Sequence, residues 1–190
     1  QRSVMHPCFF GYGSLVNRDT HTYAAADRAR LEGWRRKWVY TQARGLAFLS
    51  VVPDAATAID GLIAEVPNAD WAALDAREHG YARIASGSSV RHPRAAETLI
   101  SHYSVPRETW VASSDNRILL SYLDVVVQGY LREYGAGGVA DFFATTDGWE
   151  TPILNDRAAP QYPRAKLLSA QETALVDQHL ALRGAAVVAA

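Results

Sequence analysis

The sequence predicts one α+β domain built on a largely antiparallel sheet or barrel. Strand-like runs crowd the first 105 residues, helical patterns dominate the remainder, and no repeat or linker separates the two parts. A length of 190 residues corresponds to about one domain, and 48% hydrophobic residues suffice for a sizeable core. We therefore expect residues 1–190 to form a single domain, and we interpret Gln1–Val4, ahead of Met5, as residues left from cloning.

The predicted strands are apolar or alternate in polarity, and turn residues bound them. Trp34, Trp38 and Tyr40 share one face of a half-buried strand, which follows a polar stretch with weak helical periodicity at residues 17–31. Two β-rich runs flank Pro53–Thr57, which predicts a β-hairpin at that point. The predicted strands cover residues 8–10, 34–40, 45–52, 59–66, 81–90 and 98–105.

Capping residues place the first two helices. Asn68 is suited to cap a short helix over residues 69–77. A long helix is expected to begin at Ser114 or Asp115 and to end at Gly135, which is suited to a C-terminal cap.

The C-terminal part combines short helices with an irregular segment. Residues 139–144 predict another turn or two of helix, whereas residues 147–164 carry three prolines and are expected to be irregular. Ser169 and Glu172 have the spacing of a capping box for a last helix, which closes near Gly184 and packs on the sheet or barrel.

Charge and cysteine content exclude several kinds of partner and site. With 19 basic and 20 acidic residues, the protein lacks a long-range field that would attract nucleic acid or an anionic membrane. No apolar run is long enough to span a bilayer, and we expect no secretion signal. Cys8 is the single cysteine, which excludes an intramolecular disulfide and a thiolate zinc site and favours a reducing, cytoplasmic compartment.

The first candidate site is the turn Gly11–Leu15, which follows a buried strand. Backbone N–H groups in such a turn can converge on an anion. A dinucleotide fingerprint is excluded, because its third glycine would fall at Val16. A plain tight turn is the alternative.

The second candidate is Glu78, which shares a helix face with Trp71 and Leu74 and lies near the C-terminus of that helix. Burial and the helix dipole would both raise its pKa, as a general base working near neutral pH requires. An ion pair with Arg77 or Arg83, or a side chain turned into solvent, is the alternative.

Other signals are weaker. The six histidines show no metal-binding spacing, so we expect no metal. Cys8 lies in an apolar strand, where a thiol is usually inert, and Ser14 lacks the context of a hydrolase nucleophile. Tyr122, on the long helix, is interpreted as core packing, and residues 155–157 as either loop structure or a substrate rim.

Two motifs taken together are far more specific than either alone. Phe10–Leu15 and Leu74–Arg83 lie some sixty residues apart, and with them the chain resembles the γ-glutamylcyclotransferase-like superfamily over about residues 8 to 105. Glu78 matches the catalytic glutamate of that family, in a setting like that of its ChaC-type branch. Asn17 and Ala43–Gly45 depart from the pattern of the glutathione-specific members. The resemblance implies a small closed β-barrel flanked by helices.

The resemblance also implies an activity that needs no cofactor. The α-amine of a γ-glutamyl amide or peptide attacks its own γ-carbonyl and releases 5-oxoproline and a free amine. Glu78 would move the proton, Gly13, Ser14 and Leu15 would bind an anionic group of the substrate, and Tyr12 and Tyr81 would form hydrogen-bonding walls. Glutathione, a γ-glutamyl amino acid and a γ-glutamyl amine all stay open as small-molecule substrates, and the oligomeric state is not predicted.

Two other classes of function stay open at this point. One is a binding module that keeps the anion-binding turn without turnover. The other is an amidohydrolase that uses Cys8 or Ser14 and releases glutamate.

Overall fold

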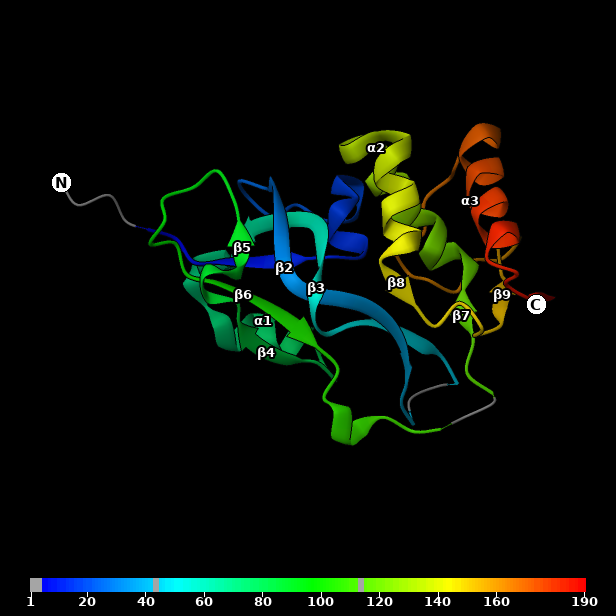
Figure 1. The fold of residues 1–190 in the computed structure, drawn as a ribbon, viewed down its shortest axis with the longest axis horizontal. Coiled ribbons are helices and arrows are strands. Elements are labelled where there is room, and N and C mark those ends of the chain that lie inside the picture. The colour runs from blue at the N-terminus through cyan, green and yellow to red at the C-terminus, as the bar shows by residue number, and fades with distance from the viewer. Residues whose placement is uncertain (1–4, 43–44, 113–114) are drawn as a thin grey trace.

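A mixed, mostly antiparallel sheet forms the main body of the protein, which confirms the predicted α+β class (Figure 1). The computed structural model describes residues 5–42, 45–112 and 115–190, so Gln1–Val4 and Ser114 lie outside the described residues. The strands follow the order β4-β6-β1-β3-β2-β5, and β8 pairs with β2. Their bounds are β1 (Cys8–Gly11), β2 (Asp27–Tyr40), β3 (Ala47–Glu65), β4 (Ala82–Ala85), β5 (Val90–Arg91), β6 (Ile100–Ser104) and β8 (Thr146–Asp147).

The sheet is strongly curled but open, so the expected closed barrel is wrong. A 3₁₀ turn at Gly87–Ser89 interrupts the single strand expected over residues 81–90. β4 therefore pairs with β6 at one edge of the sheet, whereas β5 pairs with β2 at the other edge. Because only four residues separate Ala85 from Val90, these two strand ends lie within about 18 Å of each other. The described strands stop short of closure because β4 and β5 do not pair with one another.

The hairpin predicted at Pro53–Thr57 does not form, because β3 continues through it. β3 pairs with β2 over residues 47–53 and again over residues 58–63, and residues 54–57 bulge out opposite Gly33, which has a positive φ of 82°. Pro53 lies opposite Trp34, beside this bulge, where a missing N–H is tolerated. Strand β2 also includes Asp27–Leu31, which the sequence placed in a polar stretch with weak helical periodicity.

Helix α1 (Trp71–Arg77) lies close to its predicted position, but its cap differs. The side chain of Asp70 accepts a hydrogen bond from Ala73 N–H over 3.1 Å. Asn68 does not act as the cap, because it lies two residues before Asp70, inside the 3₁₀ turn Pro67–Ala69, in the left-handed region with a φ of 56°.

Helix α2 (Leu120–Ala144) begins later than the predicted start at Ser114 or Asp115. It is kinked at Gly135, where the first of two helices was expected to end. Asp115 precedes it, and the chain first forms the short strand β7 (Ile118–Leu119). Gly135 has a φ of 72°, which separates the helix into the two predicted parts. Figure 1 shows α2 between the main sheet and α3 (Ala170–Leu182), and its fully buried Leu123, Val126 and Phe143 belong to the main core.

A second, parallel sheet was not predicted. It has the order β10-β9-β7, with β9 (Ile153–Asn155) and β10 (Val187–Ala189) drawn from segments expected to be irregular or terminal. The predicted capping box at Ser169 and Glu172 is present at the start of α3. Among the described residues, no helix combines the length and the apolar character needed to cross a membrane.

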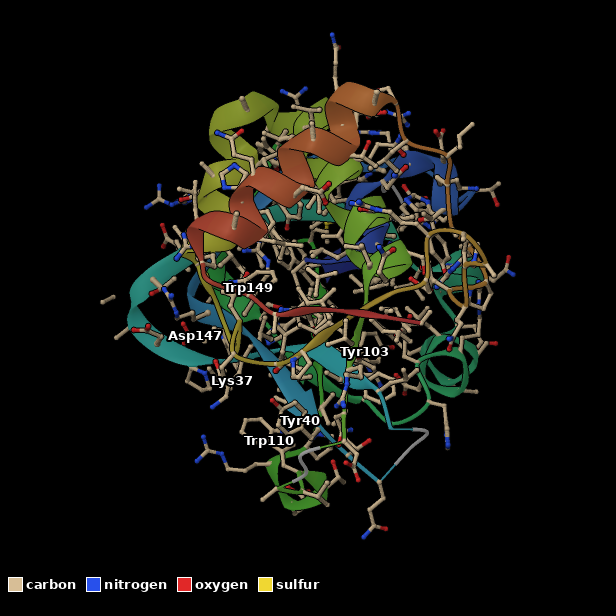
Figure 2. All side chains as sticks on the ribbon, turned by 90° about the vertical axis from the view of Figure 1, so that its right-hand side faces the viewer. Lys37, Tyr40, Tyr103, Trp110, Asp147 and Trp149 are labelled. Carbon is tan, nitrogen blue, oxygen red and sulfur yellow. The ribbon has the colours of Figure 1, made fainter. Side chains whose placement is uncertain are left out.

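The segment after β6 returns along the end of β2. Val111 N–H donates to the carbonyl of Tyr40 over 2.9 Å, and the Lys37 ammonium lies over the Trp110 ring at 5.4 Å. Figure 2 shows Tyr40 and Trp110 next to one another in this view, with Lys37 nearby. This aromatic and basic cluster lines none of the cavities described below.

Candidate active site

The turn Gly11–Leu15 leaves the end of β1, a strand held between β3 and β6. The turn needs glycine at positions 11 and 13 because a Cβ atom would clash there, and not because either residue has a positive φ. A Cβ at Gly11 would lie 2.2 Å from Leu15 Cδ2, and a Cβ at Gly13 would lie 2.6 Å from the hydroxyl of Tyr122. The turn therefore packs directly against its own end and against helix α2.

The carbonyl groups of this turn have internal partners. Tyr12 O accepts from Arg36 Nε over 3.0 Å and from the Tyr130 hydroxyl over 2.9 Å. Ser14 O accepts from the Thr20 hydroxyl over 2.9 Å. In contrast, no acceptor within the described residues takes a backbone hydrogen bond from the N–H of Gly13 or Leu15. The turn is thus left with N–H groups to offer to a ligand.

Asn17 fastens the turn to helix α2. Its fully buried side-chain amide donates to the carbonyl of Val125 and to the side chain of Gln128, each over 3.0 Å. Gly129 permits the close approach, since a Cβ there would lie 2.6 Å from Asn17 N. Asn17, the departure from the glutathione-specific pattern, is thus a structural anchor, whereas Ala43 and Arg44 of the other departure lie outside the described residues.

Glu78 caps the C-terminus of α1, where its backbone N–H donates to Leu74 O over 3.0 Å. Burial raises the pKa of its carboxyl, and the guanidinium groups of Arg164 and Arg77 lower it. Neither expected ion pair forms: Arg83 pairs with Asp75 at 3.1 Å, and Arg77 lies over the ring of Tyr23. Among the described residues, the Glu78 carboxylate has no salt bridge.

Glu78 and the turn face one cavity of about 110 Å³. All six residues singled out from the sequence line this cavity: Tyr12, Gly13, Ser14, Leu15, Glu78 and Tyr81. The sequence did not mark the residues that complete its walls as site residues; they include Leu49, Tyr103, Arg164 and Tyr122, which was interpreted as core packing.

The tyrosine hydroxyls around Glu78 are neutral and mostly engaged. Burial raises the pKa of Tyr12 and of Tyr81 well above the usual value, so both stay protonated. Tyr12 donates its proton to the carbonyl of Tyr103 over 2.6 Å, and Tyr81 donates to the carbonyl of Leu49 over 3.0 Å. Both hydroxyl oxygens can therefore accept a hydrogen bond from a ligand in the cavity.

The interpretation of Tyr122 as core packing is incomplete, because Tyr122 also lines the cavity. Its hydroxyl lies over Gly13, and it contacts the backbone of Ser14 as well. Burial keeps this hydroxyl neutral by raising its pKa. No local signal marks Tyr122, because it differs from a core tyrosine only through its contact with a turn over a hundred residues earlier.

Asn155 ends strand β9, and Asp156 and Arg157 are loop structure. Asp156 accepts hydrogen bonds from the N–H and the hydroxyl of Ser121, over 2.8 and 2.6 Å, and from Gln161 N–H over 2.8 Å. Arg157 pairs with Asp124 at 2.8 Å and with Asp177 at 2.9 Å. These bonds fix the segment after β9 against α2 and α3, and its later residue Arg164 reaches the cavity.

The alternative nucleophiles lack the partners that hydrolysis requires. Cys8 is buried, burial raises the pKa of its thiol, and it is absent from the cavity wall. Ser14 lines the cavity, but His21 is committed: its Nε2 contacts Leu15 O at 2.9 Å and its Nδ1 accepts from Tyr23 N–H. Within the described ranges, no group of three histidine, cysteine or acidic side chains could hold a metal ion.

Comparison with known proteins identifies the fold. No family model and no curated protein sequence matches the chain. A solved structure described as gamma-glutamyl cyclotransferase has a TM-score of 0.56 at 13% identity, covering 90% of this chain and 98% of that chain. An uncharacterized protein from Homo sapiens has a TM-score of 0.58 at 13% identity, covering 91% of this chain and 99% of that chain.

YkqA from Bacillus subtilis has a TM-score of 0.53 at 13% identity, covering 75% of this chain and 56% of that chain. At these identities the likenesses establish a shared fold. The chain has the γ-glutamylcyclotransferase-like fold that its two motifs predict.

Proposed function

We propose that the protein is a γ-glutamylcyclotransferase, which converts a γ-glutamyl amide or peptide into 5-oxoproline and a free amine. The observation that carries the proposal is the half-buried Glu78 carboxylate, which forms no salt bridge in the described part of the chain and lies in the same cavity as the turn N–H groups of Gly13 and Leu15. The fold shared with a structure described as gamma-glutamyl cyclotransferase supports the same activity.

Glu78 carries the proton. The substrate's α-ammonium gives one proton to the Glu78 carboxylate, and the freed amine attacks the γ-carbonyl carbon. The carbonyl oxygen becomes an oxyanion as the new C–N bond closes a five-membered ring. Glu78 then returns the proton to the departing nitrogen as the old C–N bond breaks. The ring nitrogen loses its second proton, which the released amine takes up to become an ammonium, so no net proton or cofactor is consumed. A carboxyl with a raised pKa is suited to both transfers, and general acid–base catalysis of this kind contributes roughly 10² to 10⁴ in rate.

The cavity walls supply complementary groups for the two ends of the glutamyl part. The N–H groups of Gly13 and Leu15 can bind either the α-carboxylate or the oxyanion. The oxygens of Tyr12 and Tyr81, whose own protons are engaged elsewhere, can accept from the α-ammonium. Holding amine and carbonyl together in this way supplies the near-attack geometry of an intramolecular reaction.

The test is product analysis with Glu78→Gln. Purified protein incubated with a panel of γ-glutamyl compounds should release 5-oxoproline, measured by mass spectrometry. Glu78→Gln should lower kcat by about 10² to 10⁴ with the fold retained, because the amide cannot accept the proton. Glu97→Gln, which changes an exposed glutamate outside the cavity, is the matched control.

Either of two outcomes would overturn the proposed cyclotransferase activity. Release of glutamate in place of 5-oxoproline would indicate hydrolysis. Saturable binding of a γ-glutamyl compound without any product would indicate a binding module.

A further inference from the structure

A second cavity, of about 280 Å³, adjoins the first at Glu78. The residues that line both cavities are Ser14, Leu49, Glu78, Tyr81, Tyr122 and Arg164. A substrate whose glutamyl part fills the first cavity would therefore extend its leaving group past Glu78 into the second.

Beyond this shared wall, the lining of the second cavity is mainly apolar. Ala47 and Phe48 come from the start of β3, Leu46 immediately precedes them, and Leu119 comes from β7. The volume lies just below the range for drug-sized ligands, which fits a single amino acid better than a dipeptide. The apolar walls favour a large aliphatic or aromatic side chain.

Arg164 provides a positive charge at this cavity, and its only acidic neighbour on the cavity wall among the described residues is Glu78, whose pKa it lowers without a salt bridge. Its guanidinium lies 5.7 Å from the centre of the Tyr162 ring, and it forms no salt bridge within the described part of the chain. Arg157, seven residues earlier in the same segment, is by contrast held by two aspartates. Arg164 is therefore available to an anionic group of a ligand.

Tyr162 adds an independent observation that points to a ligand. Its hydroxyl is buried and has no hydrogen-bond partner among the described residues, and its side chain lines the second cavity. A buried hydroxyl left without a partner is costly, so a polar group of a bound molecule would relieve that cost. The backbone of Tyr162 is fixed, since its N–H donates to the hydroxyl of Ser121 over 3.3 Å.

We propose that the second cavity is the leaving-group subsite, and that the preferred substrates are γ-glutamyl derivatives of single large apolar amino acids. The α-carboxylate of the leaving amino acid pairs with Arg164 and accepts from the Tyr162 hydroxyl. Its side chain packs against Leu46, Phe48 and Leu119. This inference rests on the proposed cyclotransferase activity and adds the class of amine that is released.

The experiment compares γ-glutamyl-leucine with γ-glutamyl-isopentylamide, which differ only in the carboxylate of the leaving group. The wild-type protein should favour γ-glutamyl-leucine, mainly through KM, when 5-oxoproline release is measured. Arg164→Gln should lower the ratio of kcat/KM for the two compounds by about 10- to 100-fold, as one charge-assisted contact predicts. Arg183→Gln, which changes an exposed arginine outside both cavities, should leave the ratio unchanged.

A second variant tests the apolar wall. Phe48→Ala should reduce the preference for γ-glutamyl-leucine over γ-glutamyl-alanine, roughly 5- to 30-fold, because it removes a wall that only the larger side chain contacts. Because Phe48 is half-buried, circular dichroism and a melting curve of the Phe48→Ala protein are recorded first, to check that it is folded.

The outcomes separate this inference from the proposed activity. Equal losses for both compounds in Arg164→Gln, or faster turnover of glutathione than of γ-glutamyl-leucine, would overturn the subsite while the cyclotransferase activity stands. Failure of every compound to yield 5-oxoproline would overturn the activity and the subsite together.

Discussion

The guanidinium of Arg36 donates from Nε to the backbone carbonyl of Tyr12 over 3.0 Å, at a position where the arginine is only 1% exposed. Its other donors reach the carbonyl of Asp60 and the hydroxyls of Thr145 and Tyr130. The rings of Tyr130 and Phe142 each lie 4.9 Å from the guanidinium carbon. The buried guanidinium of Arg36 therefore holds the Tyr12 carbonyl in the protein interior, and the N–H groups of Gly13 and Leu15 are left to face the cavity.

Arg36→Lys should unfold more easily and also lose activity. A lysine has one compact ammonium in place of a planar fork, so it cannot serve the carbonyls of Tyr12 and Asp60 together. We expect a loss of roughly 2–4 kcal/mol in the free energy of unfolding, measured with urea, and a fall in kcat/KM at a temperature where the variant is folded. Arg28→Lys, which changes an exposed arginine of the same strand, is the control, and equal behaviour of the two variants would contradict the role of Arg36.

The acid limb of the pH profile should report Glu78. Activity requires the carboxylate, so kcat/KM should fall as the pH drops through the pKa of Glu78, and burial places that pKa above the usual value for glutamate. Arg164 lowers the same pKa, so Arg164→Gln should move the limb to higher pH. A limb that stays in place in Arg164→Gln, or lies at the usual glutamate value, would argue against Glu78 as the titrating base.

Glu78→Gln should stabilise the protein at neutral pH. A folded pKa above the unfolded one means that the native state holds the proton more tightly, so stability falls as the pH rises through this window and the full cost persists above it. The amide removes that cost, and each 1 kcal/mol gained would raise Tm by about 2–4 °C. The gain should vanish near pH 3, where Glu78 is protonated in both states. A lower Tm for Glu78→Gln at pH 7.5 would show that the charge has a partner.

The sequence could predict those site residues whose role is visible within one short segment. The glycines of the turn and the position of Glu78 on the face of Leu74 are visible within a few residues, whereas Tyr122 and Arg164 reach the cavity through contacts across more than a hundred residues. The same limit applies to the fold. The turn signal at Pro53 is real, since Asp54 accepts hydrogen bonds from Ala56 N–H and from the Thr57 hydroxyl. The strand nevertheless pairs with β2 on both sides of residues 54–57, so the chain forms a bulge there and does not reverse.

Cys8→Ala should leave the activity intact. The thiol is buried in the strand that leads to the turn, outside the cavity wall, and cyclisation uses the amine of the substrate as its nucleophile. Removal of the sulfur should cost about 1 kcal/mol or more of stability, so rates are compared where both proteins are folded. An acyl group trapped on Cys8 in wild-type protein would overturn the cyclotransferase mechanism.

Gly13 and Tyr122 should be energetically coupled through the space they share. In Gly13→Ala the new methyl group would lie 2.6 Å from the Tyr122 hydroxyl, so the turn or the Tyr122 side chain must shift, at a cost of roughly 1–3 kcal/mol. Tyr122→Phe removes that oxygen, and the remaining ring carbon lies 3.8 Å away, at ordinary contact distance. In the double variant the Gly13→Ala substitution should therefore cost less than it does alone, by about 1 kcal/mol or more in urea unfolding. Additive losses, within about 0.5 kcal/mol, would mean that the helix does not set the position of the turn.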